Sequence, residues 1–120
     1  MKLMKIFVFG SNLAGRHGAG AALHARLHYN AKYGVGIGRT GNAYAIPTKD
    51  RSLHSLPLII IQVYIEEFID YAKTHSHLEF FVTRLGCGLA GYKEKQIAPM
   101  FREAPENCEL PVGWRNYPSV

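Results

Sequence analysis

The sequence predicts an α/β fold in which helices cover a mostly parallel central sheet. Strand-like apolar segments alternate with helical patterns along the chain, and glycine-rich loops follow two of the strands. The 120 residues suffice for one domain, and 48% hydrophobic against 19% charged residues indicates a packed core rather than a disordered chain. We therefore expect residues 1–120 to form a single domain.

The first part of the chain is predicted to hold a strand, a glycine loop and a helix. A strand is expected at residues 5–9, where Ile6-Phe-Val-Phe9 is a continuous apolar run, which is typical of a strand covered on both faces. Apolar residues recur at helical spacing over 19–32, and Gly34 suits the position just after a helix end. Residues 39–42 carry turn-forming side chains and are expected to form a turn.

The rest of the chain continues this alternation. Pro47 is expected to end the strand that contains it. Pro57 suits the first turn of a long helix. The apolar residues of that segment recur at helical spacing, which outweighs the preference of its isoleucines for a strand. The expected elements are a strand at 43–46, a helix at 57–73, a strand at 79–83, a short helix from Lys93 that Pro99 limits, and an edge strand at 107–110. Trp114 and Tyr117 are expected to dock the tail on the core.

The charge balance narrows the classes of ligand. A formal net charge of +5 favours an anionic ligand, and both a nucleotide and a nucleic acid would satisfy it. The sequence holds no block of like charges, so a basic tail for nucleic acid is not indicated. A stripe of interleaved aromatic and basic residues, which single-strand-binding proteins favour, is also missing.

The cysteines and the N-terminus bear on the compartment. Cys87 and Cys108 are too far apart for a Cys-x-x-Cys motif and are expected to be free thiols in a reducing cytoplasm, although one disulfide stays possible. The opening Met-Lys-Leu-Met-Lys precedes only a short apolar stretch without a cleavage site, which favours a strand over a signal peptide. No apolar run approaches the roughly 20 residues that cross a bilayer, so no membrane partner is expected.

The chain is organised around the glycine-rich stretch at residues 10–24. Its glycines leave the backbone uncovered where a helix begins, and a helix N-terminus offers unpaired N–H groups and a positive dipole end to an anion. A second glycine loop, residues 86–91, follows a later strand. Both loops and the corner at 47–49 should meet at the carboxyl edge of the sheet. The alternative is a strand-to-helix turn that merely needs glycine.

Two common nucleotide-binding motifs are not supported. Gly86, Gly88 and Gly91 match the spacing of a dinucleotide fingerprint, but the fingerprint needs a further strand that ends in an acidic residue, and none follows. A Rossmann oxidoreductase is therefore not expected. A P-loop is excluded because neither Gly-Lys-Ser nor Gly-Lys-Thr occurs.

Lys49 and Asn12 are the strongest candidates for chemistry at the predicted edge. A lysine at a strand end can hold a phosphate or attack a sugar aldehyde, and the alternative is an exposed loop lysine. Asn12 is either a turn residue or a buried amide that binds ligand hydroxyls. Ser11 has no evident His and Asp partners and is expected to cap a turn or bond a ligand.

Other candidates have ordinary structural alternatives. His24 and His28 lie one helical turn apart, but no third ligand is evident, so a solvated helix face and no metal are expected. Tyr92 either stacks on a ribose or base or packs in the core. Cys87 is expected to be a small buried residue rather than a nucleophile.

The order of these features resembles the macrodomain family, which binds ADP-ribose. The likeness rests on Ser11-Asn12 after the first strand, the Arg16-His-Gly-Ala-Gly-Ala-Ala loop, Lys49 after a strand, and the late Arg84-Leu-Gly-Cys-Gly-Leu89 motif. It covers roughly residues 5–103 and is greatest to the branch with the terminal ADP-ribose glycohydrolase and the antitoxin that reverses DNA ADP-ribosylation. The resemblance implies a three-layer α/β/α fold with a mixed, mostly parallel sheet.

The resemblance also implies roles for individual residues. Lys49 matches the reactive lysine of that branch, which engages the anomeric carbon of the distal ribose, and Asn12 would position that ribose. The ligand would otherwise be held by Gly10, Ser11, Arg16, Gly18, Ala19, Gly20, Gly86, Cys87, Gly88, Leu89, Ala90, Gly91 and Tyr92.

One departure from the family bears on catalysis. The position of the catalytic aspartate holds Ala90 here, so the acid/base group is missing unless Asp50 or Glu94 substitutes. We therefore expect binding of ADP-ribose or a related compound, with Lys49 as the candidate for hydrolysing ADP-ribosyl groups from a modified macromolecule without a cofactor. A non-catalytic ADP-ribose-binding module is the alternative, and a small basic nucleic-acid-binding protein is a more distant one.

Overall fold

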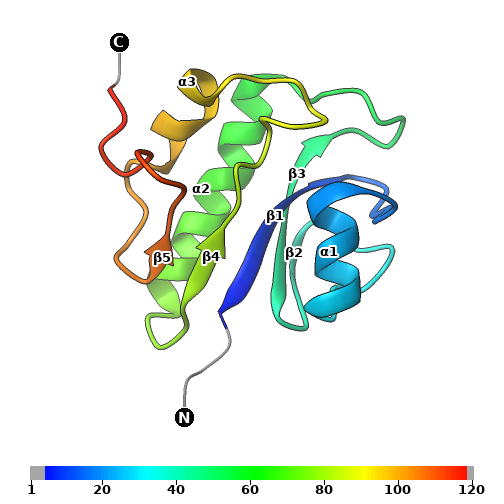
Figure 1. Cartoon of the computed structure of the whole chain (residues 1–120), viewed down its shortest axis with the longest axis horizontal. Helices are drawn as coiled ribbons and strands as arrows, with labels where there is room; N and C mark the ends of the chain where they lie inside the picture. The colour runs from blue at the N-terminus through cyan, green and yellow to red at the C-terminus, as the bar shows by residue number, and fades with distance from the viewer. Residues whose placement is uncertain (1–4, 119–120) are drawn as a thin grey trace.

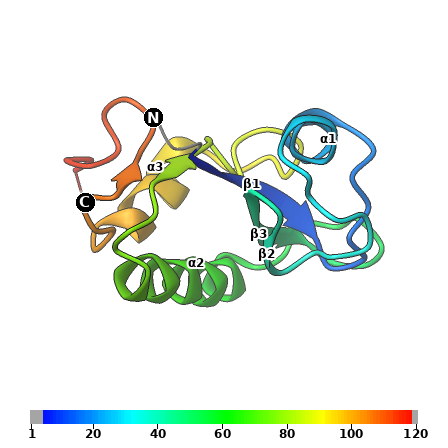
Figure 2. The same cartoon turned by 90° about the horizontal axis from the view of Figure 1, so that it is seen from below.

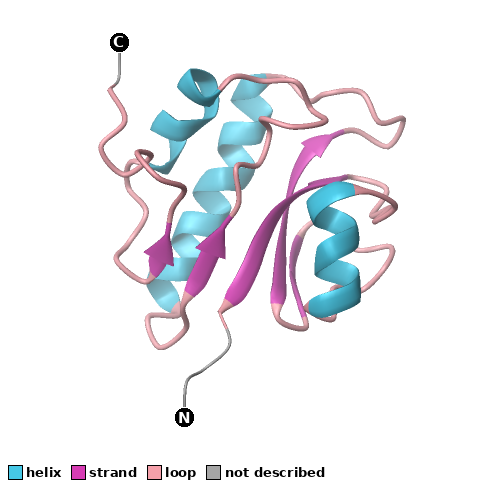
Figure 3. Ribbon diagram, in the orientation of Figure 1, coloured by secondary structure: helices cyan, strands magenta, loops and turns pink. Residues whose placement is uncertain are grey.

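The computed structural model describes residues 5–118 and contains a five-stranded sheet between two helical layers (Figures 1 and 3). The strands are β1 (Ile6–Asn12), β2 (Gly38–Thr40), β3 (Ala43–Lys49), β4 (Phe80–Val82) and β5 (Cys108–Glu109), and the helices are α1 (Gly20–His28), α2 (Leu58–Thr74) and α3 (Glu94–Ile97), with a 3₁₀ turn η1 (Ala98–Phe101). Residues 1–4 and 119–120 lie outside the described residues, so most of the segment weighed as a signal peptide is not described.

The predicted three-layer α/β/α fold with a mixed, mostly parallel sheet is confirmed. The strand order is β2-β3-β1-β4-β5. β1 is parallel to β3 and β4, and β4 is parallel to β5, whereas β2 is antiparallel to β3. Figure 2 shows α1 on one side of the sheet and α2 on the other. β1 therefore lies at the centre of the molecule.

The apolar run in β1 divides its side chains between the two faces of the sheet. Phe7 and Phe9 belong to a small core with Ala25 of α1, whereas Ile6 and Val8 belong to the larger core beneath α2. All four β1 side chains are buried. Burial on both faces explains why this strand is continuously apolar rather than alternating.

The larger core is built on aromatic contacts between α2, the sheet and the C-terminal segment. The ring of Phe68, which is fully buried, lies 5.0 Å from that of Tyr44 and 5.4 Å from that of Phe80. Trp114 is buried and Tyr117 packs partly against the same core, so the predicted docking of the tail is confirmed. The C-terminal segment thereby closes the α2 face of the fold.

α1 ends earlier than the sequence pattern predicts. The helix was expected over 19–32, but it ends at His28, with Tyr29 as its C-cap and Asn30 in the left-handed region at φ 59°. Tyr29 leaves the helix because its ring stacks on Phe7 at 4.7 Å and its carbonyl accepts the N–H of Asn42. Tertiary packing on the sheet thus overrides the helical periodicity.

β2 is a strand that the sequence analysis missed. The turn expected over 39–42 is a tight hairpin, in which residues 41–42 form the loop and β2 pairs with Ala43–Ala45 of β3. The dipeptide Gly41-Asn42 is itself a signal for a two-residue hairpin.

Pro47 does not end its strand, which continues to Lys49 rather than stopping at residue 46. Pro47 lies beyond the residues that pair with β2 and next to a register shift between β1 and β3, where Ser11 is opposite Pro47 and Asn12 is opposite Lys49. A proline is tolerated at such edges and irregularities because no ladder hydrogen bond needs its missing N–H. The shift also moves Lys49 level with the end of β1.

β1 runs three residues past its predicted end at residue 9, because it continues to pair with β3 through Asn12. The helix α2 and the strands β4 and β5 agree with the prediction to within about one residue at each end. α2 covers 58–74, β4 covers 80–82, and β5 covers 108–109. Lys93 is the N-cap of α3, and Pro99 lies in η1, where the α-helix has already ended. Within residues 5–118, no helix has the length and apolar character needed to cross a membrane.

The segment after β1 packs at backbone contact distance against residues 33–37. The N–H of Gly34 donates to the carbonyl of Gly15 at 2.8 Å, and the hydroxyl of Ser11 donates to the carbonyl of Gly36. A Cβ on Gly15 would lie 2.2 Å from the carbonyl carbon of Gly34, and one on Gly36 would lie 2.1 Å from the carbonyl oxygen of Asn12. Glycine is required at both positions because no side chain fits between the two segments.

We expect Gly36→Ala to destabilise the fold by about 3 kcal/mol, because its methyl group meets a backbone oxygen that has no freedom to move. Gly18→Ala is the matched control, since a Cβ on Gly18 meets no atom within 4 Å and its φ is not positive. Urea unfolding of both variants measures the difference. Equal stabilities of the two variants would contradict the packing described above.

Candidate anion-binding site

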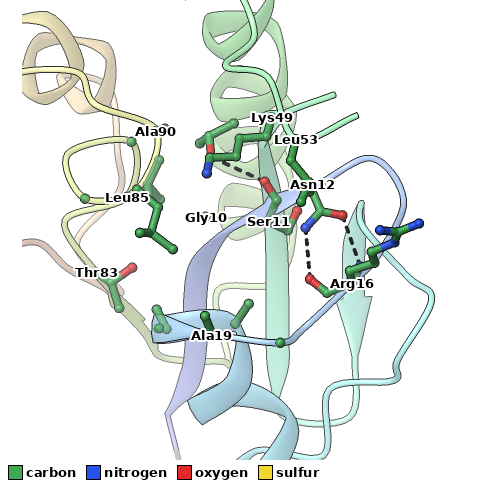
Figure 4. Close-up of a pocket in the computed structure, with 18 of the residues that line it drawn as sticks. Gly10, Ser11, Asn12, Arg16, Ala19, Lys49, Leu53, Thr83, Leu85 and Ala90 are labelled. Carbon is green, nitrogen blue, oxygen red and sulfur yellow. Dashed lines mark hydrogen bonds between the residues drawn. The ribbon is translucent and has the colours of Figure 1, made fainter. Parts of the chain in front are cut away.

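A cleft of about 500 Å³ lies where β1, β3 and β4 end (Figure 4). Its walls come from the β1–α1 loop, the end of β3 with the loop that follows, and the loop after β4. The lining residues are Gly10, Ser11, Asn12, Arg16, Gly18, Ala19, Gly20, Ala21, Ala22, Thr48, Lys49, Leu53, Thr83, Arg84, Leu85, Gly86, Gly88, Leu89 and Ala90. The two glycine loops and the β3 corner are thus brought together at the carboxyl edge of the sheet, as predicted.

The first wall exposes an uncapped helix N-terminus. Ala19 is the N-cap of α1, with an extended backbone at φ −156° and no side-chain hydrogen bond to the first turn. The earliest N–H within the helix that has a backbone acceptor is that of Leu23, which donates to Ala19. No acidic residue lies in the first turn. The N–H groups of residues 20–22 and the positive end of the helix dipole are therefore available to an anion.

The second wall is a loop whose backbone is only partly used in its own turns. The N–H groups of Cys87, Gly91 and Tyr92 donate to carbonyls within the loop. Within residues 5–118, the N–H groups of residues 88–90 donate to no protein acceptor. The Ser55 hydroxyl donates to the Ala90 carbonyl at 2.6 Å and fixes the loop against the segment before α2. This wall therefore presents a second group of N–H donors.

The two walls come close to each other at Leu89. A Cβ on Gly20 would lie 3.9 Å from the Leu89 side chain, although Leu89 is 75% exposed. The donors of the α1 N-terminus and those of the second loop thus lie on opposite sides of one narrow cleft. Successive backbone N–H groups in such loops form concave sites for anions.

Asn12 shapes the first wall through its side chain. Its Oδ1 accepts the N–H of Arg16 at 3.0 Å, and its Nδ2 donates to the carbonyl of Arg16 at 2.9 Å (Figure 4). One amide therefore binds both backbone groups of a residue four positions later and holds the loop in a closed turn. Asn12 ends β1, is buried and lines the cleft, and its amide fixes the turn that follows the strand. Binding of ligand hydroxyls by this amide stays a prediction.

The charged residues that line the cleft are all basic. They are Arg16, Lys49 and Arg84, and no carboxylate is among the lining residues within 5–118. The Arg16 guanidinium is turned away from Leu85 and Ala90, whereas the Lys49 side chain extends toward that wall (Figure 4). The resulting field favours an anionic ligand.

The two carboxylates nearest the cleft are bound elsewhere. Oδ1 of Asp50 accepts the N–H groups of Ser52 and His54 and closes its own loop. Oε1 of Glu94 accepts the indole N–H of Trp114 at 2.9 Å and forms an ion pair with Arg84. Neither carboxylate lines the cleft, so the geometry supports neither as an acid/base group for the cleft.

Lys49 is placed for contact with a ligand. It lies at the end of β3, is half-buried, and its carbonyl accepts the N–H of Leu13. Its ammonium group forms no hydrogen bond or ion pair with any described residue. A lysine that lines a cleft without a protein partner is available to an anion or to a sugar carbon.

Three of the predicted ligand-binding residues do not line the cleft. Tyr92 packs against the larger core and its hydroxyl donates to the Leu56 carbonyl at 2.5 Å. Cys87 also packs against that core, and partial burial raises the pKa of its thiol, which keeps it neutral. Gly91 is exposed, and its N–H donates to the carbonyl of Gly88. Tyr92 and Cys87 thus support the second wall from the core side, whereas Gly91 does not.

Several lining residues were not singled out as site residues from the sequence. They are Ala21, Ala22, Thr48, Leu53, Thr83, Arg84 and Leu85. Arg84 and Leu85 belong to the motif that carried the family resemblance, and Thr48 lies beside Lys49, so proximity to those motifs was the available signal. Nothing in the sequence marked Leu53 or Thr83 as a site residue. Leu53 is an apolar residue in a polar loop and Thr83 lies at a strand end, and both situations are common.

The histidines on α1 form no metal centre with other residues. His24 and His28 are exposed, and their ring centroids lie 4.6 Å apart. In the described part of the chain, no group of three potential metal ligands comes together. Both cysteines are free thiols.

His17 is a buried support for the first wall that sequence reasoning did not single out. Its ring is fully buried between Phe9 and Tyr33, its Nε2 lies 3.2 Å from the carbonyl of Val35, and its Nδ1 has no partner. Burial lowers the pKa of His17, and the nearby positive charge of Arg26 adds to that effect. The neutral ring thus holds the loop onto residues 33–35.

Comparison with known proteins shows the fold and no function. No family model matches the chain, and no curated protein matches its sequence. A solved structure of a protein of unknown function from Bacteroides thetaiotaomicron is similar, with a TM-score of 0.63 at 14% sequence identity. The likeness covers 92% of this chain and 87% of that one. At this identity, it concerns the architecture alone.

We expect His17 to make stability fall with acid. The folded-state pKa lies below the ordinary value of 6.5, so the unfolded state binds the proton first as pH falls. The stabilisation is complete above pH 6.5 and is lost as pH falls from there through the folded-state pKa, by at most about 1.4 kcal/mol per pH unit. Urea unfolding at a series of pH values should show a shallower dependence for His17→Gln than for the wild type.

His77→Gln is the control for this experiment, because His77 is an exposed loop residue. It should keep the pH dependence of the wild type. If His17→Gln and the wild type lost stability in parallel, His17 would not be the group responsible.

Proposed function

We propose that the protein binds ADP-ribose or a related ADP-ribosyl compound in this cleft. The observation that carries the proposal is the two sets of unused N–H groups on its two walls, at residues 20–22 and 88–90. The described lining residues add basic side chains and no carboxylate. A diphosphate between two such walls would receive donors from both sides. The N–H groups account only for the diphosphate of the ligand. We infer its ribose and adenine from the order of the motifs around the cleft, which resembles that of macrodomains.

The proposal assigns a role to each part of the cleft. The α1 N-terminus and the second loop hold the diphosphate, and Asn12 keeps the first loop closed around it. Lys49 lines the cleft, where the distal ribose would sit. As a neutral amine it would attack the anomeric carbon, and the new C–N bond would form as the bond from that carbon to the modified group breaks and its electron pair leaves with that group. In this proposal the ligand is a modified macromolecule or a free ADP-ribosyl metabolite. The two free cysteines fit a reducing cytoplasm as its compartment.

A binding module without catalysis is the second candidate, and a specific observation favours it. The residue at the family's aspartate position is Ala90, and the two nearby carboxylates, Asp50 and Glu94, are bound to other groups. Lys49 is then the only lining residue suited to covalent chemistry, and no lining carboxylate within residues 5–118 is present to move a proton. A general nucleic-acid-binding role has less support, because the donors converge on a cleft and not on an open surface.

Calorimetric titration with ADP-ribose tests the binding claim. We expect a dissociation constant in the micromolar range or tighter, roughly −8 kcal/mol or better, with AMP and NAD as controls and AMP binding weakly. Lys49→Ala should weaken binding by about tenfold, since it removes a charged contact. Lys73→Ala removes an equal charge from the exposed side of α2 and should leave the affinity unchanged. Absence of heat with folded protein would refute the proposed function.

Release of ADP-ribose from modified nucleic acid and modified protein separates an enzyme from a binding module. A glycohydrolase requires turnover by the wild type that Lys49→Ala abolishes. A binding module requires affinity without turnover. In either case we expect Ala90→Asp to raise the rate of release, because it places a carboxylate in the cleft wall. An unchanged rate with intact binding would show that position 90 does not supply the acid/base group.

A further inference from the structure

Leu53 combines two features that folding alone does not explain. Its φ is +66°, in the left-handed region that side chains other than Gly, Asn and Asp rarely adopt, and its side chain is 45% exposed. A turn that needs this conformation is ordinarily built with glycine or asparagine, and an exposed turn is ordinarily polar. Strained residues of this kind cluster at ligand-binding sites.

The loop around Leu53 is built to hold it in this conformation. Oδ1 of Asp50 accepts the N–H groups of Ser52 and His54 at 2.9 and 3.0 Å. The Leu53 N–H donates to the Asp50 carbonyl at 3.1 Å, and the Asp50 N–H donates to the His54 carbonyl at 2.8 Å. Lys49 and Ser55 form a β-bridge at the base of the loop. The loop is therefore a closed turn that fixes the direction of its leucine.

The loop places Leu53 in the lining of the cleft, near Lys49. Leu53 is a lining residue, and Figure 4 shows it beside Lys49 and Asn12. Asn30 is the only other residue besides glycine with a positive φ in the described chain. It lies just after α1, outside the cleft lining, and is of a type that accepts this conformation. Only at Leu53 does an unfavourable backbone present an apolar side chain to the site.

We infer that Leu53 is a specificity-determining residue that packs on the group joined to the anomeric carbon of the terminal ribose. The inference rests on the proposed function, which places that ribose at Lys49. An isobutyl side chain forms no hydrogen bond, so it favours a planar, weakly polar group such as a nucleobase or an aromatic ring, which buries much apolar area at once. A charged or strongly hydrated substituent gains nothing from it.

Two ligands that differ only at that carbon test the inference. The probes are ADP-ribose and its phenyl thioglycoside, which carries a neutral aromatic ring on the anomeric carbon through sulfur and resists hydrolysis. We expect Leu53→Ala and Leu53→Gly to weaken binding of the phenyl probe by about tenfold, and to change the affinity for ADP-ribose by less than about twofold. Two variants are used because glycine alone would also loosen the loop.

Matched controls lie outside the cleft lining. Leu27→Ala truncates another exposed leucine, and Asn30→Gly changes the other left-handed residue. Both should bind the two probes as the wild type does. Leu53→Gly should also unfold at a higher temperature than Leu53→Ala, because glycine relieves the backbone conformation.

The outcomes separate this inference from the proposed function. If the wild type fails to bind ADP-ribose, the proposed function and the inference both fail. If the wild type binds ADP-ribose but the Leu53 variants lose the same factor for both probes, or for neither, the inference alone is overturned. A selective loss for the phenyl probe supports it.

Discussion

The cleft depends on how tightly the chain is folded back after β1. The Asn12 amide binds both backbone groups of Arg16, and the same segment then passes over residues 33–37 at distances that leave no room for a Cβ on Gly15 or Gly36. This fold-back delivers the chain to the start of α1 with an extended Ala19 and no side-chain cap. Without it, the helix N-terminus would not open toward the carboxyl edge of the sheet. The fixed loop thus makes a strand-to-helix connection into one wall of the cleft.

The positive charge that lines the cleft depends on the contacts of two nearby carboxylates, Asp50 and Glu94, and not only on the excess of basic residues. Asp50 closes the loop that carries Leu53, and Glu94 joins Arg84 to Trp114 at the C-terminal segment. Each carboxylate accepts hydrogen bonds outside the cleft lining, and the charge of Glu94 offsets that of Arg84, which lines the cleft. The same arrangement that favours an anion also deprives the site of a general base. The features of the cleft that favour an anion therefore work against acid/base catalysis there.

Local patterns in the sequence predict the layers, the long helix and the meeting of both glycine loops at one edge, because apolar periodicity and parallel-strand geometry suffice for these. They do not predict that α1 ends at His28, where Tyr29 turns away to stack on the sheet, or that β3 passes through Pro47, since both depend on neighbours distant in the sequence. The same holds for the site. Lys49 was found because it follows a strand, whereas Leu53 becomes notable only through its backbone conformation, which no residue pattern reveals.

The uncapped start of α1 has a consequence for the lifetime of the protein. Backbone donors that lack acceptors make the first turn of a helix prone to fraying, and Ala19 supplies no side chain to prevent it. An anion seated there would complete the turn, so the bound form would open less often than the free form. Resistance to cellular proteases would then rise with ligand supply, and the amount of protein in the cell would follow the abundance of its ligand.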